Sequence, residues 1–198
     1  MKEIHLVVGP NGAGKTTFVE FTLQPLMPAL PFVNADVIAK VRWPDAPEAH
    51  SYEAARIAEA TRDTFIETGR AFIAETVFSH PSKIDIARNA RHHGYAVHLH
   101  VVMVIEDMSV ARVQHRVESG GHSVPEEKIR DRYRRLWANV AETVRHTTTA
   151  AFYDNTQKGS PVRVAFFADG YPLGPATWPS WTPTELTSLW TTHGGADA

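Results

Sequence analysis

Cysteine is absent from the 198 residues of the chain. Its absence excludes a disulfide scaffold, a thiol nucleophile and any metal site that is held by thiolates. Long hydrophobic runs are absent too: the longest, residues 99–105, is interrupted by His100 and is far shorter than the roughly 20 residues that a membrane helix needs. The formal net charge of −2 argues against a broad basic surface for nucleic acid. We therefore expect a cytoplasmic protein that binds no membrane and meets nucleic acid only as the 5′ end of a substrate.

Histidine is plentiful, with 11 copies, but it forms no metal-binding motif such as HExxH. His98 and His100 alternate with apolar residues in an expected strand, so we expect them to face a packed helix. The sequence therefore predicts no zinc site.

What the sequence does contain is an alternation of short apolar segments with helical ones. Strands are expected at residues 4–8, 32–34, 72–76, 95–105, 150–153 and 162–167. Helices are expected at residues 18–23, 52–68, 81–94, 110–117 and 129–144. This order predicts an α/β fold of three αβα layers, with a mostly parallel sheet between helices.

Residues 9–16 match the pattern G-x-x-x-x-G-K-[ST], and they lie between an expected strand and an expected helix. In such a P-loop the backbone N–H groups surround a polyphosphate, while Lys15 adds positive charge and the Thr16 hydroxyl ligates Mg²⁺. The sequence therefore predicts a P-loop NTPase that binds a nucleotide with Mg²⁺. The predicted nucleotide-binding residues are Gly9, Pro10, Asn11, Gly12, Ala13, Gly14, Lys15, Thr16, Thr17 and Arg112.

The P-loop alone leaves the reaction open, because ATPases, GTPases and kinases share it. A GTPase is disfavoured, since the chain has no Asn-Lys-x-Asp guanine motif. Residues 118–122 are similar to the signature of ABC ATPases, but a charged helix follows them instead of an apolar strand ending in Asp-Glu. Three functions stay open: a small-molecule kinase, a nucleotide-gated ATPase or binding module without an acceptor, and a nucleoside or polynucleotide 5′-hydroxyl kinase.

Two acidic residues stand at the ends of expected strands. Asp36 follows the strand at 32–34, and Glu75 with Thr76 ends the strand that begins at residue 72. The carboxyl ends of parallel strands face the same ligand site as the P-loop. We predict that Asp36 is the catalytic base and binds the acceptor, and that Glu75 and Thr76 hold the acceptor, with Glu75 also able to ligate the metal. The alternatives are a helix N-cap for Asp36 and a solvated strand end for Glu75.

A basic helical hairpin lies between residues 112 and 135, which hold six of the 14 arginines. Because negative charge accumulates on a moving phosphoryl group, we predict a lid that closes over ATP. Arg116 and Arg132 are the predicted catalytic contacts, with Arg112 and Arg130 next. His122, in the break between the helices, would hydrogen-bond a phosphate or cap the turn.

For some of these arginines the alternative is a solvated face that pairs with nearby acids. We expect this role for Arg134 or Arg135, because Glu126, Glu127 and Asp131 lie on the same helix.

Taken together, these strings resemble the zeta-toxin family of P-loop kinases. The likeness covers about residues 4–155 and rests on the P-loop and on the strings at 32–36, 72–76, 111–117, 120–125, 129–133 and 153–155. The resemblance implies an ATP- and Mg²⁺-dependent kinase in which Asp36 is the base, Glu75 helps to hold the acceptor, and Arg116 with Arg132 stabilise the moving phosphate. It also implies a UDP-N-acetyl sugar as the acceptor and a small helical antitoxin as a partner.

The domain organisation follows from these assignments. Residues 1–170 are expected to form the P-loop kinase domain, with the lid at about 112–135. Residues 171–198 are rich in tryptophan and proline, and they are expected to pack on the same domain and to contain a short helix.

Overall fold

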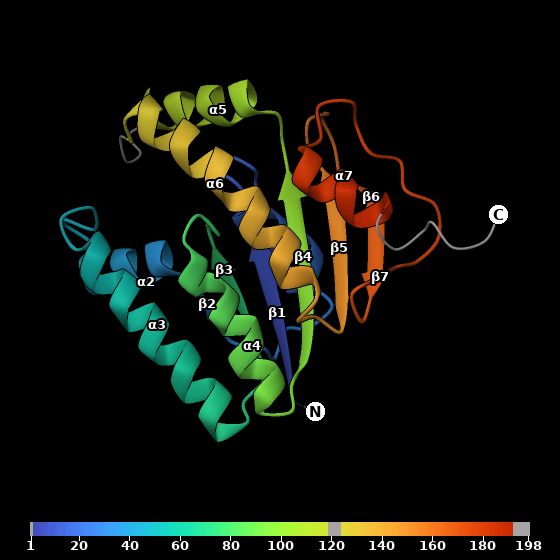
Figure 1. Ribbon diagram of the computed structural model, residues 1–198. Helices are drawn as coiled ribbons and strands as arrows, with labels where there is room; N and C mark the ends of the chain where they lie inside the picture. The colour runs from blue at the N-terminus through green and yellow to red at the C-terminus, as the bar shows by residue number, and fades with distance from the viewer. Residues whose placement is uncertain (1, 119–123, 192–198) are drawn as a thin grey trace.

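One seven-stranded sheet organises the computed structural model, which describes residues 2–118 and 124–191 (Figure 1). The strands are β1 (Glu3–Val8), β2 (Phe32–Val33), β3 (Phe72–Thr76), β4 (Ala96–Met103), β5 (Thr149–Asp154), β6 (Val162–Ala168) and β7 (Tyr171–Pro172). Their order across the sheet is β2-β3-β1-β4-β5-β6-β7, in which β1 to β5 are parallel and the last two strands are antiparallel. The predicted mostly parallel sheet is confirmed.

The antiparallel edge arises from a tight turn that our sequence analysis missed. Asp169 and Gly170 join β6 to β7, and both have positive φ angles, of 48° and 83°. Two consecutive positive φ angles characterise the hairpin turn that Asp-Gly sequences favour. The dipeptide was therefore a readable signal for β7.

Helices lie in all the regions where the sequence predicts them, and one further helix, at residues 35–42, was not expected. They are α1 (Lys15–Phe18), the π-helix η1 (Val19–Leu23), α2 (Ala35–Arg42), α3 (Ser51–Thr68), the 3₁₀ helix η2 (Pro81–Lys83), α4 (Ile84–His92), α5 (Glu106–Glu118), α6 (Glu126–Val144) and α7 (Thr184–Thr191). Helix α3 ends at Gly69, whose φ of 73° a residue with a side chain rarely adopts.

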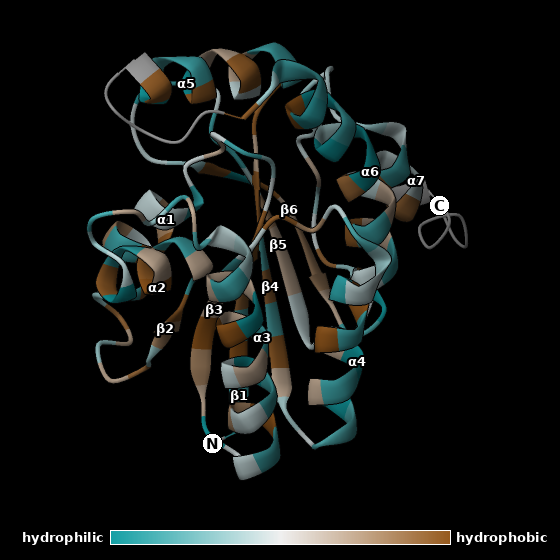
Figure 2. Cartoon of the chain, turned by 90° about the vertical axis from the view of Figure 1, so that its left-hand side faces the viewer, coloured by the Kyte–Doolittle hydropathy of each residue, from teal (hydrophilic) through white to brown (hydrophobic). Residues whose placement is uncertain are grey.

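Helices cover the two faces of the sheet unequally. One face packs its apolar side chains against α3, α4, α6 and α7 in the main core (Figure 1). The other face, which carries Val7, Ile73 and Val102, is covered by Phe18, Val19 and Leu23 of α1 and η1. Figure 2 shows α1 on one side of the strands and α4 and α6 on the other. The predicted three-layer α/β fold is confirmed, with one thick layer of helices and one thin one.

The C-terminal segment contributes to the main core. Leu186 and Leu189 of α7 are buried in it, and Trp178 and Trp181 pack against it. Among the described helices, none combines the length and the hydropathy that crossing a bilayer requires.

Candidate active site

The P-loop runs from the end of β1 to the start of α1, and its backbone leaves no room for side chains at two glycines. A Cβ atom on Gly9 would overlap the carbonyl oxygen of Val102 in the neighbouring strand. Gly14 has a φ of 86°, and a Cβ there would lie 2.6 Å from Nδ2 of Asn155. The glycines therefore let β4 and the chain after β5 approach the loop closely.

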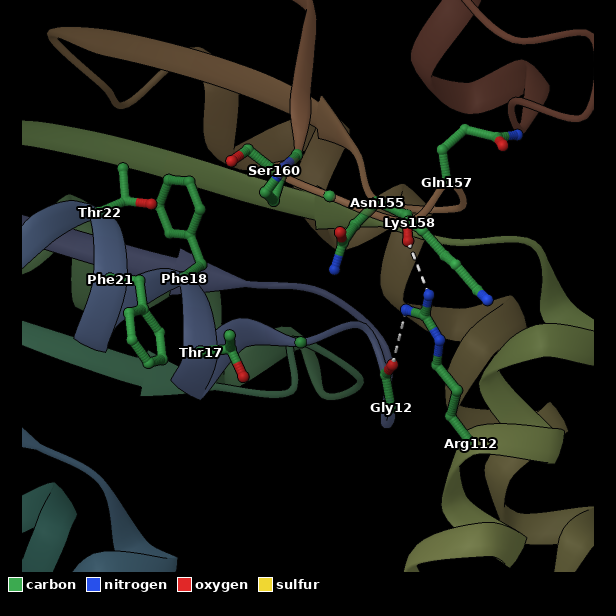
Figure 3. Close-up of a pocket in the computed structure, with 13 residues that line it drawn as sticks. Gly12, Thr17, Phe18, Phe21, Thr22, Arg112, Asn155, Gln157, Lys158 and Ser160 are labelled. Carbon is green, nitrogen blue, oxygen red and sulfur yellow. Dashed lines mark hydrogen bonds between the residues drawn. The ribbon is translucent and has the colours of Figure 1, made fainter.

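Three side chains from other parts of the chain hold the loop from outside. Ser109 Oγ donates to the carbonyl oxygen of Asn11 at 2.6 Å, and Asn155 Nδ2 donates to that of Ala13 at 2.8 Å. The Arg112 guanidinium donates to the carbonyl oxygens of Gly12, at 3.4 Å, and Asn155, at 3.0 Å (Figure 3). Since these bonds engage carbonyl oxygens, the loop keeps its carbonyls on the outside, as a loop that presents N–H groups to an anion must.

Lys15 is the charged centre of the site. Its side chain is 7% exposed, Nζ donates to the carbonyl oxygen of Pro10 at 2.9 Å, and Nζ lies 4.0 Å from Oε1 of Glu75. Burial lowers the pKa of Lys15, the charges of Glu75 and Asp36 act to raise it, and Arg116 acts to lower it. The structure therefore brings three other residues that the sequence singled out, Glu75, Asp36 and Arg116, within electrostatic reach of Lys15.

Glu75 forms a small hydrogen-bonded cluster beside Lys15. Its Oε2 accepts the Thr16 hydroxyl at 2.8 Å and the Asn34 amide at 2.7 Å. Because Thr16 gives its hydrogen to Glu75, the lone pairs of its oxygen stay free to ligate a cation. A hydroxyl and a carboxylate are the oxygen ligands that Mg²⁺ prefers, so this pair fits the predicted metal. Glu75 is thus no solvated strand end, and Asn34 is a site residue that our sequence analysis did not select.

Asp36 stands in the first turn of α2, where Asn34 caps the helix. Asn34 Oδ1 accepts the backbone N–H groups of Asp36, at 2.7 Å, and Val37, at 3.2 Å. The N-cap alternative for Asp36 is therefore wrong, because Asn34 fills that role. Among the residues that the structure describes, the exposed Asp36 carboxylate has no hydrogen bond or ion pair.

The predicted lid arginines separate into two groups. Arg116 is exposed and Arg132 half-buried, and neither forms an ion pair with a residue of 2–118 or 124–191. Arg130 instead donates to Glu126 and Asp107, at 2.9 Å each, and its NH1 lies 3.4 Å from Glu106. The Glu126 hydrogen bond is the largest of the contacts that raise the pKa of Arg130. The structure thus gives Arg130 the ion-paired role.

The remaining predicted residues are Arg134, Thr76 and His122. Arg134 lies within 4 Å of Glu106 and Asp131, as expected for the solvated face. Thr76 ends β3 beside Val8, half-buried and next to Glu75. His122 lies outside the described residues.

A cavity of about 580 Å³ adjoins the outer side of the P-loop (Figure 3). Its walls are the P-loop, helices α1 and η1, Arg112 and the chain after β5: Gly12, Gly14, Thr17, Phe18, Phe21, Thr22, Arg112, Asn155 and residues 157–161. Its volume suits a nucleoside-sized ligand. Sequence reasoning missed residues 157–161, although Lys-Gly-Ser-Pro at 158–161 is a turn signal that comes shortly after a strand ends at the ligand edge.

The strand order and the P-loop after the central strand define the α/β fold of a P-loop nucleotide-binding protein. A family model described as zeta toxin matches residues 1–160, and the chain belongs to that family. The predicted resemblance is confirmed.

Similar proteins and structures agree with this assignment. An uncharacterized protein of Haemophilus influenzae is 29% identical over 126 residues, which are 63% of this chain and 88% of the relative. The AvrRxo1-ORF1:-ORF2 structure with ATP has a TM-score of 0.68 at 15% identity; the match covers 87% of this chain and 60% of that one. The structure of the PezAT toxin–antitoxin system of Streptococcus pneumoniae has a TM-score of 0.59 at 15% identity; the match covers 82% of this chain and 70% of that one. The structure of shikimate kinase from Acinetobacter baumannii, in complex with shikimate, has a TM-score of 0.52 at 16% identity; the match covers 80% of this chain and 85% of that one. These distant likenesses show the fold.

Proposed function

We propose that this protein is an ATP- and Mg²⁺-dependent kinase that transfers the γ-phosphate of ATP to a hydroxyl of a small acceptor, such as a UDP-N-acetyl sugar. The observation that carries the proposal is the exposed, unpaired carboxylate of Asp36 beside the charged cluster of Lys15, Glu75 and Arg116. A protein that only binds a nucleotide needs no free carboxylate at this place. A kinase needs one to receive the proton of the acceptor.

ATP would lie along the P-loop with its base in the adjoining cavity. The base would rest against Phe18 and Phe21, the latter 78% exposed, while Arg112 would lie near the phosphates. Lys15 would bind the outer phosphates, for which its bond to Pro10 O is exchanged.

Thr16 would hold Mg²⁺ directly, with Glu75 beside it, since Glu75 already orients the Thr16 hydroxyl. The ion supplies charge neutralisation of the phosphates. Asn34 supports the pair through its bond to Glu75, and by capping α2 it also fixes the position of Asp36.

In the transfer step Asp36 accepts the proton of the acceptor hydroxyl. The hydroxyl oxygen forms a bond to the γ-phosphorus, the bond from that phosphorus to the bridging oxygen breaks, and ADP leaves with the electron pair. Lys15, Arg116 and Arg132 neutralise the charge that builds up on the moving group.

The test is the Asp36→Asn variant, which keeps the shape and removes the base. We expect the rate of phosphoryl transfer to fall by about a hundredfold or more, as the loss of a general base does. ATP binding, measured by calorimetry, should persist. Asp63→Asn, on the exposed side of α3, is the matched control and should leave transfer unchanged. Transfer at the normal rate in Asp36→Asn would refute the proposal.

The acceptor class is tested by incubation with labelled ATP and a panel of nucleotide sugars, nucleosides and oligonucleotides, followed by mass spectrometry. A phosphorylated sugar supports the proposal, and a phosphorylated 5′ end moves the protein to the polynucleotide kinases. ATP hydrolysis that no acceptor changes would instead indicate a nucleotide-gated ATPase.

An antitoxin partner belongs to the same proposal, since PezAT is described as a toxin–antitoxin system. If the kinase is toxic, its expression in bacteria arrests growth and Asp36→Asn abolishes the arrest. Co-expression of a small helical antitoxin should then restore growth.

A further inference from the structure

Two histidines and one glutamate cluster on the thinly covered face of the sheet, at the end of β1 away from the P-loop. His5 of β1 pairs in register with His98 of β4, and Glu3 stands two residues before His5 on the same face. One ligand atom from each of the three residues can be chosen so that all lie within 4.8 Å of one another. The cluster shares no residue with the P-loop site.

Hydrogen bonds hold both rings by the same nitrogen. His5 Nδ1 is hydrogen-bonded to Nε2 of His100 at 3.1 Å, and His98 Nδ1 is hydrogen-bonded to the Thr149 hydroxyl at 2.8 Å. In both rings Nε2 then has no hydrogen-bond partner among the residues that the structure describes. Metal-binding histidines commonly have this arrangement, in which a partner on one nitrogen fixes the ring while the other nitrogen ligates.

His5 provides independent evidence of a missing ligand. The residue is 8% exposed, and its Nε2 is buried without a hydrogen-bond partner, 3.9 Å from Oε2 of Glu3. A buried polar atom without a partner is costly, so one in a native protein calls for an explanation. A cation bound between Nε2 and the carboxylate would satisfy it.

We propose that Glu3, His5 and His98 form a binding site for a divalent transition metal of the zinc class, with water completing the coordination. Two imidazoles and a carboxylate are a ligand set that Zn²⁺ accepts, whereas imidazole does not suit Mg²⁺. This proposal replaces our sequence-based expectation that the strand histidines bind no metal.

The three side chains reach this geometry by small movements. The rings of His5 and His98 are stacked, with centroids 4.8 Å apart and an interplanar angle of 23°. The chosen ligand atoms lie within 4.8 Å of one another, whereas two nitrogens that are each about 2.0–2.1 Å from one zinc ion are at most about 4 Å apart, so the side chains must move closer together. The Glu3 side chain, 28% exposed, is free to swing toward them. The bound ion would join β1, which leads into the P-loop, to β4.

The test is metal titration of the untagged, chelator-treated protein without nucleotide. Co²⁺ should bind with a stoichiometry of about one and give the visible absorption of a tetrahedral site, and Zn²⁺ should displace it while Mg²⁺ should not. Zn²⁺ should also raise Tm, because it binds the folded state. Glu3→Gln and His98→Asn should each lower the affinity at least about tenfold, and Thr149→Val by about tenfold, as the loss of a supporting hydrogen bond does.

Two variants are matched controls. His92→Asn, an exposed histidine on α4, and Thr16→Val, in the P-loop, should keep the Co²⁺ spectrum and the affinity. Glu3→Gln removes only the charge of a partly exposed side chain, so it tests the site without a risk to folding. The proposal is overturned if Co²⁺ does not bind, or if Glu3→Gln and His98→Asn bind it as the unaltered protein does.

Discussion

The two helices of the basic hairpin, α5 and α6, carry arginines that make different kinds of contact. On α5, Arg112 donates to the P-loop backbone and Arg116 acts on the charge of Lys15. On α6, Arg130 and Arg134 are paired with carboxylates, and Arg130 reaches across to Glu106 and Asp107 of α5. Positive charge on α5 thus acts on the P-loop, while Arg130 and Arg134 of α6 pair with acidic residues of α5 and α6.

The difference teaches that a count of cations overstates the charge available to a ligand. A carboxylate within hydrogen-bonding distance neutralises a guanidinium and fixes its direction. Arg132 and Arg135 are the exceptions on α6, since neither has an ion pair among the described residues, and Arg135 donates to the backbone carbonyl oxygen of Asp131 instead. If the comparison holds, variants on α5 should impair catalysis or ATP binding, and variants of the paired arginines on α6 should not.

The largest effect is expected for Arg116→Ala. Arg116 has no ion pair in the described part of the chain and lies within electrostatic reach of Lys15, so its charge is available to the transferred phosphate. We expect kcat to fall by about 10²–10³-fold, the loss typical of one transition-state donor. Steady-state kinetics measure it. Arg135→Ala, an exposed arginine on α6, is the control and should keep kcat, whereas an unchanged kcat in Arg116→Ala would remove Arg116 from the mechanism.

Arg112→Ala should act mainly on ATP binding. The variant loses the bonds to Gly12 O and Asn155 O and one wall of the cavity. We expect the dissociation constant of ATP to rise about tenfold, which corresponds to about 1.4 kcal/mol, with a smaller change in kcat. Calorimetry with a non-hydrolysable ATP analogue measures it. A selective loss of kcat with normal ATP affinity would place Arg112 on the moving phosphate instead.

The fold was largely readable from the sequence, because its signals are local. Alternating apolar and helical segments around a P-loop predict a parallel sheet, and the long strand and the two lid helices stand where periodicity places them. What was missed depends on contacts that periodicity does not encode. The two-residue strand β7 is too short for a periodic pattern, and helix α2, which we did not expect, buries only Ala39 of its eight residues and so shows no apolar repeat.

The sequence predicted several residues of the candidate site, but it did not predict their hydrogen-bond and ion-pair partners. The P-loop motif and the strand-end positions led to Lys15, Glu75 and Asp36. Asn34 was missed because its bond to Glu75 joins residues that are 41 positions apart in the sequence. Arg130 was ranked among the phosphate contacts because sequence spacing does not show that Asp107, on the other helix, lies beside it.

Arg130→Ala should change catalysis far less than Arg116→Ala does, which would separate the roles of α6 and α5. Its three carboxylate partners are solvated to different degrees, and surface ion pairs contribute little to stability. We expect kcat and the KM for ATP to stay within about twofold, as for a pair that supports the hairpin without touching the nucleotide. Tm should fall slightly at low salt and less at high salt, where ion pairs are screened. A loss of kcat as large as that of Arg116→Ala would contradict the division between the helices.

Glu106→Gln should have the smallest effect and is the sharpest attempt to break the comparison. Glu106 lies 3.4 Å from Arg130 and 3.8 Å from Arg134, so the variant removes the one carboxylate that the two arginines share. Arg130 keeps Glu126 and Asp107, so its guanidinium stays in place, and we expect kcat and ATP affinity to be unchanged. Calorimetry and steady-state kinetics test this directly. Tighter ATP binding in Glu106→Gln would mean that the freed charge of α6 reaches the nucleotide, and that carboxylates, rather than the placement of the helix, keep it away in the unaltered protein.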